Sequence, residues 1–152
     1  MTGVVTIERI EMSDTDAHSR IVAPLAEPAT RGKFAYAPRF VMLALSDDEG
    51  VDGGLIGKLY WDWLSIETVA VPERWRGRGL GRRLLEQAET IALAEGCHSA
   101  WVDTYSFQSP GFYEAMGYRP FGRLADYPMG EERIFYAKAL AGSPMADDGM
   151  GK

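Results

Sequence analysis

Apolar residues alternate or run together in short stretches over much of the chain, and these stretches predict strands. The runs that precede the middle of the sequence cover residues 4–10, 40–45, 54–60 and 64–71. A polar, acidic turn over residues 46–50 predicts a hairpin between the second and third of them. Pro72 ends the fourth run, because proline cannot donate a hydrogen bond to a strand ladder.

Two other regions have the spacing of helices. Ser13 or Asp14 is a candidate cap for helical residues over 18–25, which Pro24 and Pro28 interrupt. A longer helix begins just after Gly79 and ends before Gly96. Its apolar residues recur three or four positions apart, at Leu80, Leu84, Ala88 and Ile91 or Ala92.

In the last third of the chain, the apolar pattern again predicts strands. Residues 100–104 predict a strand, Ser109 and Pro110 start a short helix that ends at Gly117, and two closing strands cover 118–124 and 133–140. The chain therefore predicts an α/β fold, with a mostly antiparallel mixed sheet flanked by helices. We expect one domain over residues 1–140 and a disordered tail over 141–152, where the residues are small or polar.

Composition narrows the function classes. The chain has 152 residues, 46% of them hydrophobic, and a net charge of −6, which argues against nucleic acid as a partner. An acidic surface suits a cationic substrate such as an amine, although many cytosolic proteins are simply acidic. Cys97 is the only cysteine, so no cysteine cluster for a metal is expected. No apolar stretch is long enough to span a membrane, and we expect a cytoplasmic protein.

Positive charge is concentrated in the stretch Val69–Leu85, where a strand, a glycine-rich turn and a helix follow one another. Between Pro72 and Arg83 there are five arginines and one acid, Glu73, so this window carries +4 and the rest of the chain −10. Arginines at a helix N-terminus oppose the helix dipole unless an anion binds there. The stretch therefore predicts a site for a phosphorylated ligand.

The glycine pattern of this turn separates three kinds of phosphate loop. The Walker pattern is absent, and the dinucleotide pattern needs glycine or alanine where this chain has Arg82. The pattern that remains is Arg-x-x-Gly-x-Gly, formed by Arg74, Gly77 and Gly79 and extended by Gly81.

In its context this loop resembles the pyrophosphate loop of the GNAT superfamily of acyl-CoA-dependent N-acetyltransferases. That loop reads Gln/Arg-x-x-Gly-x-Gly/Ala, and here a strand ending at Val71 precedes it and Leu84-Leu85 follow it on a helix. Downstream, residues 111–118 resemble the Phe-Tyr-x-x-x-Gly-Phe/Tyr signature of the same family. The two motifs and their strands cover about residues 54–140, whereas the first fifty residues carry no recognisable signature.

One position departs from the family pattern. Many relatives have an asparagine six residues before the Phe-Tyr pair, and this chain has Ser106 there. The hydrogen bond to the pantetheine arm then falls to Ser106 or Gln108.

The resemblance implies how acetyl-CoA, the acyl donor, would be held. Backbone N–H groups from Arg76 to Arg82 cradle the pyrophosphate, and the main chain around Val69 and Val71 pairs with the pantetheine arm like an added strand. A splay of the sheet between the strands ending at Val71 and Thr104 gives the arm its slot. The implied cofactor-binding residues are Val69, Ala70, Val71, Arg74, Arg76, Gly77, Arg78, Gly79, Leu80, Gly81, Arg82, Ser106 and Phe112; no metal is expected.

Acetyl transfer to an amine also needs a base, an oxyanion donor and an acid for the departing thiolate. Glu67 stands where relatives often carry the base, and it acts directly or through water. Tyr113 of the second motif is the candidate acid, and a backbone N–H at Val69 or Ala70 is the candidate oxyanion donor. Without the resemblance, Glu67 would be an exposed strand acid and Tyr113 a packing aromatic.

Other chemistry-bearing residues have a plain structural explanation beside a functional one. Trp61-Asp62-Trp63 either lines the acceptor pocket or forms a hairpin turn with packing tryptophans. His18 is interpreted as an exposed helix residue. Residues 105–108 follow a strand end and either border the thioester or only close a loop.

The sequence therefore predicts an enzyme that transfers an acetyl group directly from acetyl-CoA to a primary amine. The acceptor is a small cationic amine, an antibiotic, or a lysine or N-terminal amine of a peptide, and a homodimer is in keeping with the family. The alternatives are a non-catalytic acyl-CoA-binding regulatory module and a nucleotide-binding module of another fold.

Overall fold

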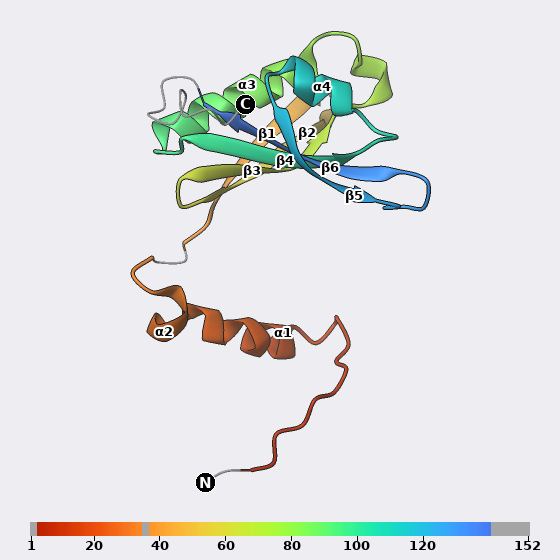
Figure 1. Cartoon of the computed structure of the whole chain (residues 1–152). Helices are drawn as coiled ribbons and strands as arrows, with labels where there is room; N and C mark the ends of the chain where they lie inside the picture. Colours follow the sequence, from red (N-terminus) through yellow and green to blue (C-terminus); the bar gives the residue numbers. More distant parts are fainter. Residues whose placement is uncertain (1–2, 35–36, 141–152) are drawn as a thin grey trace. The chain divides into compact units, whose positions relative to one another are not determined.

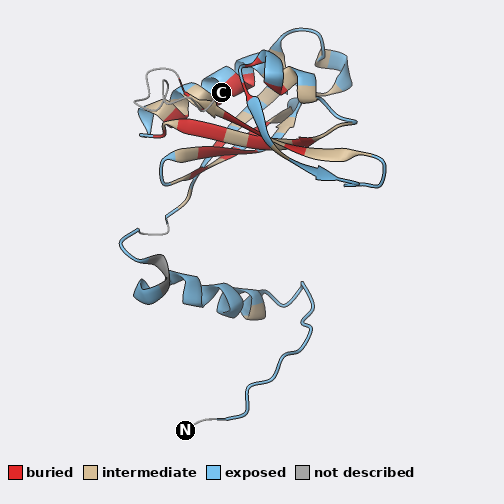
Figure 2. Cartoon of the chain, in the orientation of Figure 1, coloured by how far each residue is buried: buried red, intermediate tan, exposed pale blue. Residues whose placement is uncertain are grey.

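The computed structural model describes residues 3–34 and 37–140, and the chain divides into two units, residues 1–36 and 37–152. The first unit contains α1 (Thr15–Val22), a 3-10 turn (Ala23–Ala26) and α2 (Pro28–Arg31). The Asp14 carboxylate accepts a hydrogen bond of 2.9 Å from the backbone N–H of Ala17, which confirms Asp14 as the cap of α1. No described residue of α1 or of the 3-10 turn is buried within this unit (Figure 2).

The strand predicted over residues 4–10 is wrong. These residues have no strand structure, and Ile7 is fully exposed. A strand needs a neighbouring strand to satisfy its backbone groups, and the alternation of apolar residues alone does not supply one. The single domain expected over residues 1–140 stays a prediction, and the tail expected over 141–152 lies outside the described residues.

The second unit is built on one mixed sheet of six strands (Figure 1). The strands are β1 (Arg39–Asp47), β2 (Gly50–Tyr60), β3 (Trp63–Ala70), β4 (Ser99–Tyr105), β5 (Arg119–Ala125) and β6 (Glu132–Ala139). Their order is β1-β2-β3-β4-β6-β5, and every neighbouring pair is antiparallel except β3 and β4. The predicted α/β fold with a mostly antiparallel sheet is confirmed.

Helices α3 (Leu80–Ala94) and α4 (Pro110–Ala115) lie on one face of this sheet, and a 3-10 turn (Glu73–Trp75) leads from β3 towards α3 (Figure 1). The predicted amphipathic face of α3 is the buried one, with Leu84, Leu85, Ala88 and Ala92 against the sheet. Gly96, with φ of 93°, follows the helix as the predicted stop. Ser109 occupies the N-cap position of α4, but its hydroxyl makes no capping hydrogen bond.

The core lies between α3, α4 and the sheet face that they cover (Figure 2). The fully buried side chains include Leu55 and Leu59 of β2, Leu64 of β3, Tyr136 of β6 and Leu85 of α3. Burial of each such side chain is worth roughly 1.5–3 kcal/mol. Apolar packing therefore holds α3 on the sheet and fixes where its N-terminus points.

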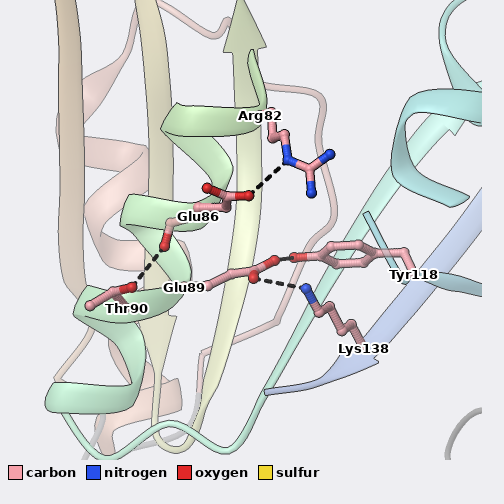
Figure 3. A network of polar contacts seen from close by, with 6 residues as sticks. All are labelled: Arg82, Glu86, Glu89, Thr90, Tyr118 and Lys138. Carbon is pink, nitrogen blue, oxygen red and sulfur yellow. Dashed lines mark hydrogen bonds and ion pairs between the residues drawn. The ribbon is translucent and has the colours of Figure 1, made fainter. Parts of the chain in front are cut away.

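A polar network also ties α3 to the sheet (Figure 3). The Glu89 carboxylate accepts a hydrogen bond of 2.7 Å from the Tyr118 hydroxyl and pairs with Lys138 Nζ at 2.9 Å. The Glu89 and Lys138 side chains are only 12% and 23% exposed, so their attraction is less screened than that of a surface pair. Burial and the nearby Glu89 carboxylate both raise the pKa of Tyr118.

Candidate active site

The sheet opens between β3 and β4. These strands are paired only from Trp63 opposite Ser99 to Ile66 opposite Val102. Beyond that point β3 stays paired with β2 as far as Ala70, and β4 stays paired with β6 as far as Tyr105. The two inner strand edges therefore diverge, which confirms the expected splay.

Glu67 is the first residue of β3 beyond the last pair with β4. The register of β2 and β3 shifts here, because Ile56 lies opposite Thr68 whereas Gly57 lies opposite Ile66. Glu67 is thus the extra residue of a β-bulge, a device that redirects a side chain and is frequent beside active sites. Its side chain is exposed, and its carboxylate makes no hydrogen bond or ion pair with the described residues.

The main chain of Val69 and Ala70 borders the same opening. Val69 lies opposite Leu55 and Ala70 opposite Gly54 on the β2 side, so β2 supports one edge of this segment. Gly54 is required there, because a Cβ at this position would lie 2.1 Å from the Leu43 carbonyl oxygen. Close packing of the strands thus fixes the edge that faces the splay.

The glycine-rich turn leads directly into the N-terminus of α3. Gly77 and Gly79 have φ of 80° and 72°, values that favour glycine, and the space beside each is open. Gly79 is the N-cap residue of α3 and supplies no side chain to the first turn. The free backbone N–H groups at the start of the helix are therefore available to an anion.

The arginines of the turn have different surroundings. Arg74 forms an ion pair with Asp52, lies 3.7 Å from Asp47 and covers the ring of Trp75. Arg76 Nε donates a hydrogen bond of 3.1 Å to the Val71 carbonyl. Both side chains thus hold the turn in place.

The remaining arginines of the turn face solvent. Arg82 pairs with Glu86 at 2.9 Å across one turn of α3, and this pair is exposed (Figure 3). Arg78 is exposed and makes no ion pair with the described residues. Arg78 and Arg82 are therefore the cofactor-binding candidates whose guanidinium groups are most accessible to a ligand.

Gly81 is the second residue of α3 and serves packing. A Cβ here would be 3.5 Å from the Phe112 ring and 3.9 Å from Val71. Phe112 of α4 and Val71 after β3 therefore meet at the start of α3, beside the half-buried Leu80. The two sequence motifs, residues 74–81 and 111–118, come together at this point.

Tyr113 is buried in α4, at 8% exposure. Its ring packs edge-on against Phe112 and Tyr118, at centroid distances of 5.0 and 6.0 Å. Its hydroxyl makes no hydrogen bond with the described residues. Every fully buried side-chain oxygen among those residues has a hydrogen-bond partner, so the Tyr113 hydroxyl is not fully buried and reaches the surface. Burial, and secondly the Asp103 carboxylate, raises the pKa of Tyr113, which keeps the phenol protonated.

Glu67 follows the last paired residue of β3 and Asp103 follows the last paired residue of β4, so these two carboxylates flank the opening. Tyr113 lies on α4, on the side of the sheet that the helices cover. The pairing of Glu67 and Tyr113 as base and acid stays a prediction.

Ser106 is engaged elsewhere. Its hydroxyl donates a hydrogen bond to Glu131 and accepts one of 2.8 Å from the backbone N–H of Glu132. Gln108 uses its side-chain carbonyl to accept a hydrogen bond from Thr104, while its amide nitrogen has no partner among the described residues. Of the two substitutes for the family asparagine, Gln108 has the free donor.

The weaker candidates have structural roles. Asp62 lies in the β2–β3 turn, at the end of β3 away from Glu67, and its carboxylate lies 3.4 Å from His98. Trp61 and Asp62 form the turn itself, as the hairpin interpretation predicts, although Trp61 is 55% exposed, and a place in the acceptor pocket stays a prediction. His18 is exposed on α1.

Sequence reasoning missed Asp103 and Arg133. They pair at 2.8 Å across β4 and β6, with side-chain exposures of 22% and 27%. The alternation Trp101, Asp103, Tyr105 was the available signal, because it places these side chains on the sheet face away from the helices.

Residues 3–34 and 37–140 contain no group of three or more histidine, cysteine, aspartate or glutamate side chains that could hold a metal ion. They also contain no helix with the length and apolar character needed to cross a membrane.

Known proteins match this chain over most of its length. The model of the Acetyltransferase (GNAT) family matches residues 7–118. Blasticidin-S acetyltransferase of Streptomyces morookaense is 46% identical over 89 residues, which are 58% of this chain and 65% of that protein. This chain is thus matched to just under two thirds of that relative's length.

Solved structures agree with the fold. A crystal structure of an acetyltransferase from Bacillus cereus has a TM-score of 0.74 and 30% identity, over 90% of this chain and 98% of that one. An acetyltransferase from Bacillus anthracis, in complex with acetyl coenzyme A, has a TM-score of 0.60 and 20% identity, over 70% of this chain and 69% of that one.

Proposed function

Because the chain belongs to the GNAT family of acetyltransferases, we propose that it transfers an acetyl group from acetyl-CoA directly to a primary amine. The observation that carries the proposal is the splay between β3 and β4, which lies beside an uncapped helix N-terminus with exposed arginines. A splayed sheet gives an extended arm a strand edge to pair with, and the helix N-terminus attracts phosphates. No observation favours a non-catalytic module.

The residues of the turn fit a pyrophosphate. Backbone N–H groups from Arg76 to Arg82 would bind its oxygens, and the open space beside Gly77 and Gly79 would let it approach the main chain. Arg78 and Arg82 would add charge-assisted hydrogen bonds. The free edge at Val69–Val71 would pair with the pantetheine amides, which supports acetyl-CoA as the donor.

Glu67 and Tyr113 would supply the chemistry. Glu67 would accept a proton from the acceptor ammonium, directly or through a water molecule, and leave the amine nucleophilic. As the new C–N bond forms, a backbone N–H of Val69 or Ala70 would donate to the carbonyl oxygen that gains negative charge. Tyr113 would give its proton to the sulfur as the C–S bond breaks.

The acceptor is proposed to be a small cationic amine. The chain outside the arginine-rich turn carries a net charge of −10, and Glu67 adds a free carboxylate to the opening. Because the relative named for blasticidin S is 46% identical over the matched region, this antibiotic is the first acceptor to try.

The test is an acetyl-CoA-dependent thiol-release assay over blasticidin S, polyamines, aminoglycosides and lysine peptides. We expect thiol release that depends on one or more of these amines, together with calorimetric binding of CoA. Absence of CoA binding at millimolar cofactor would reject the proposal altogether. Binding of CoA without release for any amine would favour the non-catalytic module.

A further inference from the structure

The sheet face turned away from α3 and α4 carries aromatic side chains at its splayed end. On β4, Ala100, Val102 and Thr104 are buried, so the alternate residues Asp103 and Tyr105 point to the other face. Tyr105 is the last residue of β4 and lies opposite Arg133 of β6. It therefore borders the same opening as Glu67, three residues beyond the last β3–β4 pair.

Arg133 organises this end of the sheet. Its guanidinium lies over the rings of Tyr105, Tyr127 and Phe135, at 5.7, 5.2 and 5.3 Å from their centroids. It also donates hydrogen bonds of 2.8 Å to Asp103 and 3.1 Å to the Tyr127 hydroxyl. The guanidinium thus links Asp103 and Tyr127 and acts as the support on which the rings are placed.

Three of the rings form a continuous surface, which we name the aromatic shelf: Tyr105, Phe107 and Tyr127. Tyr105 lies in the middle, stacked on Phe107 at 5.4 Å and tilted against Tyr127 at 5.7 Å. Phe107 is 57% exposed and Tyr127 is 43% exposed. Grouped exposed aromatic rings of this kind are typical of a binding surface.

The two segments that carry the outer rings are held in place by hydrogen bonds. Beside Phe107, Ser106 is bound to Glu131 and Glu132. In the turn that carries Tyr127, the Tyr127 N–H donates a hydrogen bond of 3.2 Å to the Glu131 carbonyl. The Gly130 N–H donates one of 3.1 Å to the Asp126 carboxylate. The shelf is therefore formed before any ligand binds, which lowers the entropy cost of binding.

The charge around the shelf is negative. Arg133 is neutralised by Asp103, and Arg123 pairs with Glu132 at 3.3 Å. Asp126 and Glu131 accept hydrogen bonds but have no basic partner among the described residues. Flat apolar rings beside uncompensated carboxylates complement a flat cation.

We propose that the aromatic shelf selects the amine acceptor, by stacking a planar ring of the acceptor on Phe107 and Tyr127 while its amine reaches the splay. This proposal rests on the proposed function and names its substrate class, which is a cationic amine attached to a planar ring. Each stacked aromatic pair adds about threefold in affinity, so a planar acceptor gains about tenfold from two such contacts.

The experiment compares two diamines of the same carbon and nitrogen skeleton, 1,4-bis(aminomethyl)benzene and trans-1,4-bis(aminomethyl)cyclohexane. Their binding to the full chain is measured by calorimetry without acetyl-CoA, and their KM by thiol release. We expect the planar diamine to have a Kd and KM about tenfold lower. Phe107→Leu and Tyr127→Leu should each reduce this difference to about threefold, while the KM for acetyl-CoA stays unchanged.

Phe121→Leu is the matched control, because Phe121 is a 63% exposed aromatic on β5 outside the shelf. This variant should keep the preference for the planar diamine. Equal affinity of the unsubstituted protein for the two diamines would overturn the proposal, whatever the variants do. A preference that stays about tenfold in both shelf variants would overturn it as well. Preferential binding without thiol release would leave the shelf supported and reject the proposed function instead.

Discussion

Ile66 on β3 and Val102 on β4 form the last residue pair that joins the two halves of the sheet. Both side chains are buried under the helices, so this pair closes the inner end of the splay. The next residues along the two strands are Glu67 and Asp103, one on each side of the opening. The point at which β3 and β4 cease to pair thus determines the positions of Glu67 and Asp103 at the opening.

Glu67→Gln is expected to lower kcat about 100-fold near neutral pH, because a general base is lost. The defect should shrink as pH rises, since more of the acceptor amine is then unprotonated without the enzyme's help. The pH dependence of kcat checks this, with calorimetry to show that CoA affinity is retained. Glu49→Gln, in the exposed β1–β2 turn, is the control. A pH–rate profile identical to that of the unsubstituted protein would exclude Glu67 as the base.

Gly79→Val is expected to weaken CoA binding about tenfold. Valine is disfavoured at φ of 72°, at a cost of roughly 1–3 kcal/mol, and relief of this strain would move the N–H groups that start α3. Gly96→Val is the matched control, because Gly96 also has positive φ, with open space, but at the other end of α3. The two variants should lose similar thermal stability, and only Gly79→Val should lose CoA affinity. Equal affinities would show that the turn does not hold the phosphates.

Tyr113→Phe is expected to lower kcat about 100-fold while the protein stays folded. The ring contacts are kept, and the hydroxyl makes no hydrogen bond that the fold would miss. Turnover with acetyl-CoA, measured together with thermal unfolding, separates the two effects. Tyr136→Phe, which alters another buried tyrosine of the same cluster, should leave kcat unchanged. An equal loss of kcat in Tyr113→Phe and Tyr136→Phe would indicate that altered packing, and not loss of the acid, lowers the rate.

The sequence predicted the elements that carry strong local signals. The turn around Gly77 and Gly79 and the start of α3 follow from residue types within a few positions of each other, and they lie where expected. The engagement of Ser106 by Glu131 could not be predicted, because it depends on how β4 pairs with the β5–β6 hairpin 25 residues later. Arg133 was missed for the same reason.

Tyr118→Phe tests how α3 is held on the sheet. At neutral pH the variant should be less stable by about 1 kcal/mol, because the hydrogen bond to Glu89 is lost. Since burial raises the pKa of Tyr118 above its ordinary value of about 10, the unfolded chain loses this proton first. The stability contributed by the protonated phenol is therefore complete below pH 10 and is lost as pH rises beyond it.

Denaturant unfolding between about pH 7 and pH 11 should show the stability deficit of Tyr118→Phe shrinking in alkali. Thr90→Val, which removes an exposed hydroxyl bonded to the Glu86 carbonyl on the same helix, should show no such dependence (Figure 3). A deficit that is constant with pH would mean that Tyr118 ionises as easily in the folded protein as in the unfolded chain.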